Sequence, residues 1–536
     1  MRTVIQGFKR YERPALIGAG LLLVLALFAR IMSYPLRHDE QFYLPAGQSL
    51  KQWSLYQDIH FTHLPNLPLL LNAIFALPGV ESDLLVGRLL VFAIWLLACY
   101  ALYATARFAG CANGTAVLLA SMLALNPLLL GPAGMLVTNN FIPVPFALLG
   151  LLLFLKGCGA SPPSIRLNFL SGICLSLAIG FKANYVFLVP PIAIASLLVP
   201  PGIGFGMRMT RVMLPLLLGA MLAGLPTLYY FASDPMHFLA HVVSFHQSAH
   251  VEYWMANNAD EGPVALSWVG KMLLAQNVWL AGGTLLIFLL ALTLTITAVT
   301  ASRQATERDD AKPWWPVILA AGLVLSAGLV SFLPTPAFPQ YFAPPIAFGL
   351  VLCALLYGRL IAAVRSQVAP VMAAVFLLTA AGALPILLPD LPALARPSKW
   401  TGNSVDRAAD NIRWLMARQA GSGPLLTLAP IYPAEAQLPR YKELALGPFI
   451  YRAVDYLPPE NRPFFRPVAS PRTLEQMLVQ SPPKAVLVGL EERLDQPLEA
   501  WAIRNAYRPV RVALGDKRKK FGKLYLAPIP ATGSDR

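Results

Sequence analysis

The chain has 536 residues, of which 56% are hydrophobic and only 13% are charged. Soluble globular proteins carry about a quarter charged residues, and disordered chains carry few apolar ones, so the composition excludes both classes. Five cysteines over this length also exclude a disulfide-stabilised scaffold. The composition therefore predicts an α-helical polytopic membrane protein.

The net charge of +15 arises from 42 basic and 27 acidic residues, and their placement argues against a nucleic-acid partner. Residues 1–389 contain 20 basic and 13 acidic residues, whereas the shorter stretch 390–536 contains 22 and 14. Charge is therefore sparse over the apolar part of the chain and dense in its tail. This change predicts a transmembrane domain over 1–389 and a separate domain over 390–536.

A bilayer core of about 30 Å needs about 20 mostly apolar residues in a helix. Eleven stretches meet this requirement, some of them only marginally, so about 11 transmembrane helices are expected. In chain order these stretches are 14–33, 84–103, 115–131, 141–156, 167–181, 184–200, 212–231, 273–299, 316–333, 342–363 and 368–388.

Basic residues in short loops mark the cytoplasmic side of a membrane protein. Four of them precede the first span, which predicts a cytoplasmic N-terminus. An odd number of spans then places the tail in the periplasm or the equivalent outer compartment. The further basic residues that this arrangement puts inside are Arg107, Lys156, Arg166, Arg208, Arg211, Arg303, Arg308, Lys312, Arg359 and Arg365.

The tail alternates short apolar runs with helical patterns, which is typical of a small α/β domain. Its length of 147 residues is sufficient for a packed core without disulfides. The expected strands are 425–428, 485–489, 510–514 and 523–527, and the expected helices are 404–419, 472–480 and 497–506.

All seven histidines fall in two loops on the predicted outer face, and the first of these loops also carries an acidic pair. Asp39 and Glu40 closely follow the first span, where a carboxylate is costly unless it is paired or liganded. Two interpretations stay open from the residues alone. Either the pair belongs to a working site on this face, or it lies in water and caps a helix that begins near Phe42.

Three cations are expected at the same depth as these carboxylates. Arg30 lies one turn before the end of the first span, and Arg88 and Lys182 lie at the outer ends of later spans. For any one of them, snorkelling to lipid headgroups is a sufficient explanation. Together, beside Asp39 and Glu40, they favour a site for a lipid-borne phosphate next to a base.

The second histidine-rich loop contains His237, His241, His246 and His250 at helical spacing. Such spacing occurs in zinc sites, although the arrangement His-Glu-x-x-His is absent from the loop. An amphipathic helix lying on the membrane surface explains the same spacing. In that case its buried face would consist of Phe238, Leu239, Val242, Val243 and Phe245.

Five segments of the membrane region carry a resemblance to a known family. They are Asp39-Glu40-Gln41-Phe42-Tyr43, Tyr56-Gln57-Asp58 with His63-Leu64-Pro65, Gly87-Arg88-Leu89, Gly180-Phe181-Lys182 and Pro339-Gln340-Tyr341-Phe342. Together they resemble the GT-C glycosyltransferases, above all the bacterial proteins similar to glycosyltransferase family 39. This branch includes protein O-mannosyltransferases and the aminoarabinose transferases that modify lipid A.

The resemblance implies the GT-C fold, the bacterial inner membrane and an inverting transfer from a polyprenyl-phosphate-linked sugar to an acceptor hydroxyl at the periplasmic face. The acceptor would be a lipid, a glycan or a protein. A carboxylate near that hydroxyl is the simplest general base, and we expect Asp39 in this role, with Glu40 orienting the acceptor or a neighbouring cation. Lys182, Arg88 and Arg30, with Tyr341 as a hydrogen-bond donor, are expected at the leaving phosphate. The residues expected to shape the substrate site are Tyr43, Asp58, His63, Gln340 and Asn140.

Two positions depart from the family pattern. Family members usually carry an acid near the outer start of the fourth span, where this chain has Asn139 and Asn140. Many also carry Arg or Lys before the late tyrosine, where this chain has Gln340. We expect these departures to affect the identity of the donor more than the class of reaction.

No cofactor is required on this view, because Lys and Arg side chains neutralise the phosphate; the resemblance also admits a divalent cation on Asp39 and Glu40. Two other functions fit a polytopic chain. A lipid or sugar transporter is one, although such proteins usually place ionisable residues near the bilayer midplane within repeated halves. A non-catalytic protein that binds a lipid carrier is the other.

Overall fold

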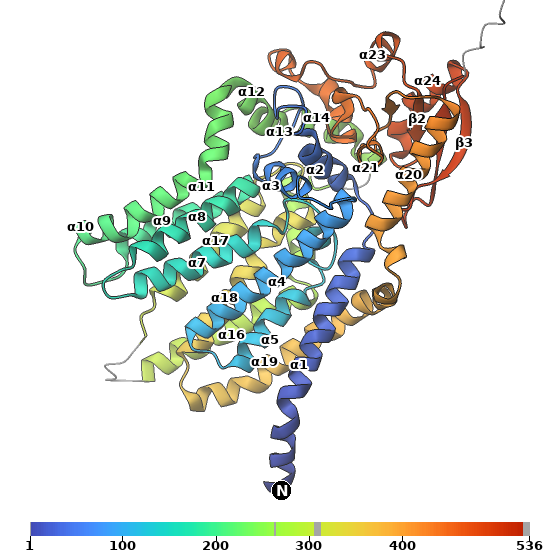
Figure 1. Cartoon of the computed structure of the whole chain (residues 1–536). Helices are drawn as coiled ribbons and strands as arrows, with labels where there is room; N and C mark the ends of the chain where they lie inside the picture. Colours follow the sequence, from blue (N-terminus) through green and yellow to red (C-terminus); the bar gives the residue numbers. More distant parts are fainter. Residues whose placement is uncertain (1, 262–263, 305–311, 529–536) are drawn as a thin grey trace, which may run out of the picture.

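A computed structural model describes residues 2–261, 264–304 and 312–528. The chain forms a helical bundle, with a small sheet and several short helices gathered at one end (Figure 1). The first helix, α1 (Arg2–Ser33), runs along the bundle, and its N-terminus lies at the opposite end of the molecule from the sheet. This confirms the predicted fold class at the level of architecture.

Helices that are long and apolar enough to cross a membrane occur five times among the described residues, or six times if a bent pair is counted. The five are α4 (Asp83–Ala109), the run Phe205–Ser233 that ends in α11 (Leu214–Ser233), α16 (Gly282–Gln304), the run Pro339–Arg359 that contains α18 (Pro344–Arg359), and the run Ala362–Ala395 that begins with α19 (Ala362–Leu387). The bent pair joins the apolar part of α1 to α2 (His38–Ser49) at 84°. This chain is therefore a multi-pass membrane protein.

The other five predicted spans correspond to shorter apolar helices of 10–17 residues. These are α5 (Asn113–Ala124), α7 (Pro143–Gly159), α8 (Ile165–Phe181), the run Ala183–Leu198 formed by η1 (Ala183–Leu188) and α9 (Val189–Leu198), and α17 (Trp315–Ser331). The span expected over 273–299 is divided, because α15 (Trp268–Trp279) ends before α16 begins at Gly282. Of the basic residues predicted to lie inside, Arg308 is outside the described residues.

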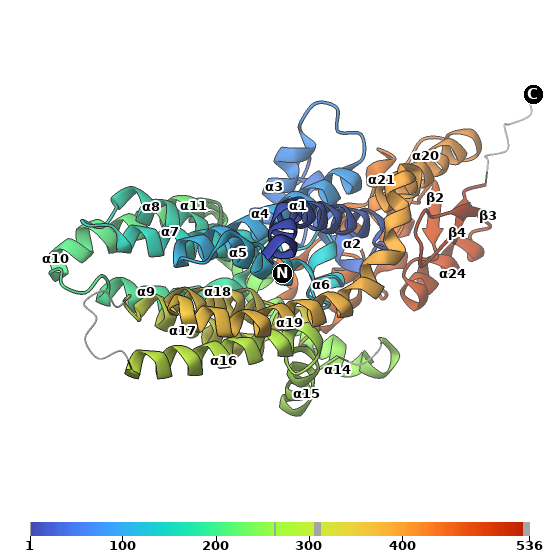
Figure 2. The same cartoon turned by 90° about the horizontal axis from the view of Figure 1, so that it is seen from below.

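Local signals account for several helix boundaries. The hydroxyl of Ser82 accepts a hydrogen bond from the backbone N–H of Leu85 and so caps α4. The same helix ends at Gly110, whose φ of 93° lies in the left-handed region that favours glycine. Two further glycines allow α8 and α11 to touch, since a Cβ on Gly172 or on Gly219 would lie 2.0 Å from a carbonyl oxygen of the facing helix. Figure 2 shows these two helices side by side.

The C-terminal unit (residues 390–528) contains a four-stranded sheet in the order β1-β2-β4-β3. Its strands are β1 (Leu425–Leu426), β2 (Ala485–Val488), β3 (Arg508–Ala513) and β4 (Phe521–Leu526); β1 and β2 are parallel and the other pairs antiparallel. The longer helices are α20 (Thr401–Gln419), α23 (Leu474–Gln480) and α24 (Gln496–Arg504), close to the three predicted ones. One apolar core runs from α1 to this sheet. The exact boundary at residue 389 stays a prediction.

The remaining elements are short and lie mostly around the end of the bundle that carries the sheet (Figure 1). In the membrane part they are α3 (Asn66–Phe75), α6 (Pro132–Met135), α10 (Phe205–Arg208), η2 (Met209–Met213), α12 (Pro235–Leu239), η3 (Ala240–Ser244), α13 (Phe245–Gln247), α14 (Ala249–Glu261) and η4 (Pro339–Phe342). In and next to the C-terminal unit they are η5 (Leu388–Ala395), η6 (Pro397–Lys399), α21 (Ile431–Glu435), η7 (Lys442–Leu444), α22 (Pro448–Ala453), η8 (Val454–Tyr456), η9 (Arg462–Phe465) and η10 (Glu492–Asp495).

Candidate active site

A cavity of about 800 Å³ lies where α2, α14, η4 and α22 meet. It brings together residues that are up to several hundred positions apart in the sequence. Polar groups from several loops share its wall with Phe449 of the C-terminal unit. The predicted site residues that line it are Asp39, Tyr43, His63, Asn140, Lys182, Gln340 and Tyr341.

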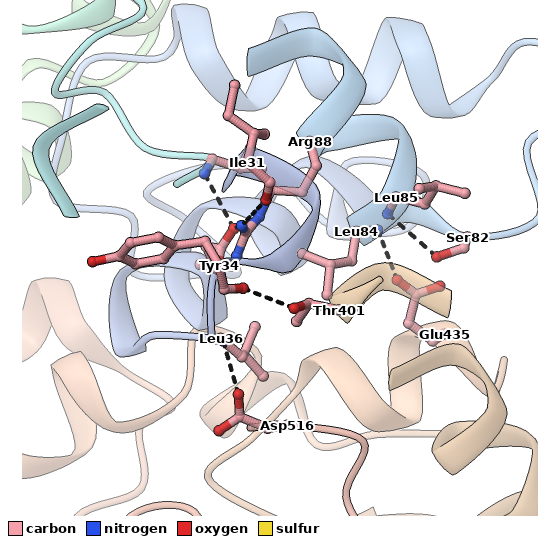
Figure 3. Close-up of polar contacts among 12 residues, drawn as sticks. Ile31, Tyr34, Leu36, Ser82, Leu84, Leu85, Arg88, Thr401, Glu435 and Asp516 are labelled. Atoms are coloured by element: carbon pink, nitrogen blue, oxygen red, sulfur yellow. Dashed lines mark hydrogen bonds and ion pairs between the residues drawn. The ribbon is translucent and has the colours of Figure 1, made fainter. Parts of the chain in front are cut away.

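The link between α1 and α2 is held in place by the C-terminal unit (Figure 3). The hydroxyl of Thr401 donates a hydrogen bond to the carbonyl of Tyr34 at 2.8 Å, and Asp516 accepts one from the backbone N–H of Leu36 at 2.9 Å. Glu435 binds the first backbone N–H groups of α4, at Asp83 and Leu84. These contacts fix the position from which α2 begins, and with it the acidic pair.

Asp39 lies in the first turn of α2, on the cavity wall. Burial raises the pKa of its carboxyl group, while the nearby charges of His38, Lys182 and Arg452 act in the opposite direction. Because α2 turns away from α1 by 84°, Asp39 lies beyond the bend at which the apolar part of α1 ends. The helix begins at His38 and not near Phe42, so both acids occupy the end of α2 where the helix dipole favours a negative charge.

Glu40 faces away from the cavity and is fully buried with Arg88. Its two oxygens accept hydrogen bonds from Nε and Nη2 of Arg88, both at 2.6 Å, and the backbone N–H of Val137 adds a third at 3.2 Å. Arg88 also donates to the carbonyl of Ile31 at 2.7 Å (Figure 3). A contact of Arg88 with a donor phosphate, which the sequence led us to expect, does not fit this geometry.

Lys182 follows the last residue of α8, and its side chain is 8% exposed on the cavity wall. Its ammonium donates a hydrogen bond to Oδ1 of Asn140 at 2.6 Å and lies 4.7 Å from the ring centroid of Tyr341. Burial lowers the pKa of Lys182 to about 7, and Asp39 opposes this shift. The position where the family usually carries an acid thus presents a neutral amide to this lysine.

Two other predicted residues lie elsewhere. Arg30 forms an ion pair with Asp390 at 2.7 Å and donates to the carbonyl of Leu130, so it braces α1 against η5. Asp58 accepts a hydrogen bond from the backbone N–H of Ser54 and closes a local turn. Neither lines the cavity, because other partners hold both side chains.

The second histidine-rich loop supplies cavity residues that the sequence analysis did not assign to the site. His246 and His250 line the cavity next to His63, with ring centroids 5.0 Å apart for His63 and His246 and 5.7 Å for His246 and His250. Burial lowers the pKa of all three imidazoles and so favours their neutral form. Their loop is broken into α12, η3, α13 and α14 and is not one surface helix.

A zinc site in this loop is not supported. Both ring nitrogens of His241 have partners, His60 at 3.1 Å and the carbonyl of His237 at 2.7 Å, and His237 also contacts Asp234. Among the residues that the structure describes, no three His, Cys, Asp or Glu side chains form a group that could hold a metal ion. Of the five residues expected on the buried face of a surface helix, Phe238 and Phe245 are buried inside the protein, whereas Leu239 and Val243 are 40% and 39% exposed, so the five do not form one buried face.

The C-terminal unit completes the cavity with three residues of α22. Pro448 and Phe449 lie on its wall together with Arg452, whose guanidinium stacks 5.1 Å from the ring centroids of Tyr253 and Trp254. The sequence contained no signal for this contribution, because it depends on long-range packing of the tail against α14. The site therefore belongs to both parts of the chain.

No family model matches the sequence, and no curated protein matches it. Two solved structures of ArnT from Cupriavidus metallidurans are similar to the chain. The structure bound to undecaprenyl phosphate has a TM-score of 0.57 at 14% identity and covers 98% of this chain and 100% of that one. The apo structure has a TM-score of 0.56 at 12% identity and covers 97% and 99%. At such low identity the similarity shows the fold alone, and this fold is the predicted GT-C fold.

Proposed function

We propose that the chain is a membrane glycosyltransferase that moves a sugar from a polyprenyl-phosphate-linked donor to an acceptor hydroxyl. One observation carries the proposal. A cavity at one end of a GT-C bundle is lined by a carboxylate, Asp39, and by a lysine, Lys182, whose ammonium contacts a neutral amide. A proton acceptor and a cation on one wall are what this transfer needs.

The lipid-linked donor is supported by the comparison with ArnT. That protein was solved with undecaprenyl phosphate, and its fold matches nearly the whole of both chains. In this chain the ammonium of Lys182 contacts the amide of Asn140 and the ring of Tyr341 on the cavity wall. This part of the wall is the surface best suited to bind a single phosphate. Since Asn140 carries no negative charge, it leaves the charge of Lys182 available to that phosphate.

In the proposed reaction the acceptor oxygen attacks the anomeric carbon of the donor sugar from the face opposite the phosphate, which inverts that carbon. The bond between this carbon and the phosphate oxygen breaks, and its electron pair leaves on the polyprenyl phosphate. Lys182 stabilises the charge that grows there. The hydroxyl proton passes to the carboxylate of Asp39, whose raised pKa makes it a better base than an ordinary aspartate.

The donor set around Asp39 is poorly suited to a divalent cation. Both oxygens of Glu40 are bound to Arg88, and the charged neighbours of Asp39 are His38, Lys182, Arg452 and Arg37, all of which are cations when protonated. We therefore propose a reaction that does not depend on a metal. Full activity after treatment with EDTA is the expected result.

Helices α2, α13 and α14, whose residues line the cavity, lie at the end of the bundle that carries the C-terminal unit, opposite the N-terminus of α1 (Figure 1). With a cytoplasmic N-terminus, as the basic residues predict, transfer would occur at the periplasmic face of a bacterial inner membrane. The acceptor is proposed as a lipid, glycan or protein that reaches this face.

The test is transfer of radiolabelled sugar from synthetic polyprenyl-phosphate donors by the purified protein in nanodiscs. Wild-type protein should transfer or slowly hydrolyse the sugar, and Asp39→Asn should lose about 100-fold or more of the rate while keeping its thermal stability and donor binding. Donor crossing the bilayer without transfer would indicate a transporter. Binding without either reaction would indicate a carrier-binding protein.

A further inference from the structure

His38 precedes Asp39 and lies on the cavity wall, but the proposed transfer reaction does not use it. Its side chain is 50% exposed, and its Nδ1 lies 2.5 Å from Oε2 of Glu491, a residue of the C-terminal unit whose side chain is only 3% exposed. A carboxylate on one ring nitrogen fixes the orientation of an imidazole and leaves the other nitrogen, Nε2, for proton transfer.

The position of Glu491 is itself fixed. It follows β2 by three residues, and the turn between them uses Gly489 with a φ of +120°, where a side chain would be strained. Asp495 accepts hydrogen bonds from the backbone N–H groups of Gly489 at 2.8 Å and of Glu491 at 2.9 Å. Because Asp516 also holds the backbone of Leu36, the C-terminal unit sets both ends of the contact between His38 and Glu491.

His38 differs from the other imidazoles of the cavity. Burial lowers the pKa of His63, His246 and His250. Burial also acts to lower the pKa of His38, but contact with Glu491 and its charge outweigh this effect and raise it above the ordinary value. The other charged groups that act on His38 are Asp39, Arg452 and Glu492.

We propose that His38 is a second proton-handling residue of this site and that Glu491 is its positioning residue. The inference rests on the proposed function, in which each transfer leaves a proton on Asp39. That proton moves to Nε2 of His38, which restores the carboxylate of Asp39 and leaves an imidazolium paired with Glu491. The half-exposed imidazolium then releases the proton to water.

This step gives a role to the contact between the C-terminal unit and His38. Asp39 lies among cations on a partly buried part of the cavity wall, whereas the side chain of His38 is half exposed. The two side chains interact electrostatically. An imidazole that exchanges protons near neutral pH is suited to carry a proton between such a carboxylate and water. Without Glu491 the ring would lose both its orientation and the charge that stabilises the imidazolium.

The first experiment measures the rate constant kcat for sugar transfer from about pH 5.5 to pH 8.5, the range in which histidine titrates. His38→Gln should lower kcat about 10- to 100-fold, leave the KM for the donor unchanged, and recover in part when free imidazole is added. Glu491→Gln should lower kcat by a smaller factor than His38→Gln does, and it should shift the pH dependence of kcat to lower pH. Wild-type kcat and an unchanged profile in His38→Gln would overturn the proposal.

The matched control is Asp234→Asn, because His237 and Asp234 form a similar pair at 2.7 Å that does not line the cavity. This variant should keep the wild-type profile. Loss of activity in His38→Gln without rescue by imidazole, together with a lowered melting temperature, would indicate a purely structural role and would also overturn the proposal.

A second readout does not depend on transfer. The rate at which diethyl pyrocarbonate modifies His38, followed by mass spectrometry across the same pH range, reports its pKa, which should fall in Glu491→Gln and stay unchanged in Asp234→Asn. An unchanged titration in Glu491→Gln would refute the positioning role even in an active enzyme. The expected titration in a protein that transfers no sugar would instead refute the proposed function, and the proton-transfer role with it.

Discussion

Asp39 and Glu40 are neighbours in the sequence, but they lie in opposite environments. Asp39 faces a cavity with Lys182 and Arg452 nearby, whereas Glu40 is fully buried and receives hydrogen bonds from Arg88 and from the backbone of Val137. Consecutive residues of an α-helix point about 100° apart, so an acidic pair in its first turn serves two purposes. One carboxylate is available for chemistry, and the other anchors the helix that carries it.

The largest effect is expected from breaking the anchor. Arg88→Met leaves the carboxylate of Glu40 buried and without its cation, which costs about 3–5 kcal/mol of stability. Thermal unfolding in detergent should show a strongly lowered melting temperature. The double variant with Glu40→Leu removes both charges and should recover much of that loss. If the double variant also recovers activity, Glu40 does not act on the substrate; a stable but inactive double variant would restore a catalytic role for it.

Lys182 is expected to affect donor use with little effect on folding. Removing one preorganised donor from a developing negative charge typically costs about 100- to 1,000-fold in rate, so Lys182→Ala should lower kcat/KM for the donor by roughly this amount. Lys182→Arg keeps the positive charge and is the matched control, which should lose less. The prediction is wrong if Lys182→Ala changes only the saturation by the acceptor.

Asn140→Asp tests the departure from the family pattern. In the wild type, the pKa of about 7 means that the positive charge of Lys182 is lost as the pH rises through neutrality. Since kcat/KM reports the free enzyme, it should fall above about pH 7. An aspartate beside Lys182 raises the pKa of the lysine and moves this fall to higher pH, but it also repels the phosphate. At pH 6 we expect kcat/KM of Asn140→Asp to be about 10-fold lower than that of the wild type, and it should decline less towards pH 9. A pH profile identical to that of the wild type would refute the role of Asn140.

The fold was more predictable from the sequence than the site was. Runs of apolar residues determine where helices form, so all eleven predicted spans correspond to helices, although 273–299 is divided at Gly282. Asp39 and Lys182, which the sequence placed at the same depth, both line the cavity. The sequence did not indicate which side of α2 faces the cavity, and it therefore did not separate Glu40 and Arg88 from the cavity residues.

Residues contributed from far along the chain were the least predictable. Glu491 and Arg452 reach α2 only through tertiary packing of the C-terminal unit, in which α21 and α22 pack against α2, and no spacing in the sequence encodes that contact. The histidines of the second loop were noticed, but helical periodicity alone did not distinguish a zinc site, a surface helix and a cavity wall. A backbone break at Ser248, which has a φ of −122° and a ψ of −92°, separates α13 from α14, and His246 and His250 on either side of it both line the cavity.

The smallest effect is expected from Arg30, which was predicted to share the phosphate with Lys182. Its ion pair with Asp390 is partly exposed, with side-chain exposures of 22% and 12%, and pairs of this kind contribute about 1 kcal/mol or less. Arg30→Ala should therefore lower the melting temperature slightly and leave the KM for the donor unchanged, in contrast to Lys182→Ala. Asp390→Asn should have the same small effect, because the pair joins α1 to η5 and does not face the cavity. A raised KM for the donor in Arg30→Ala, but not in Asp390→Asn, would show that Arg30 contacts the phosphate. Arg30 would then belong with Lys182 to the cations that bind the donor.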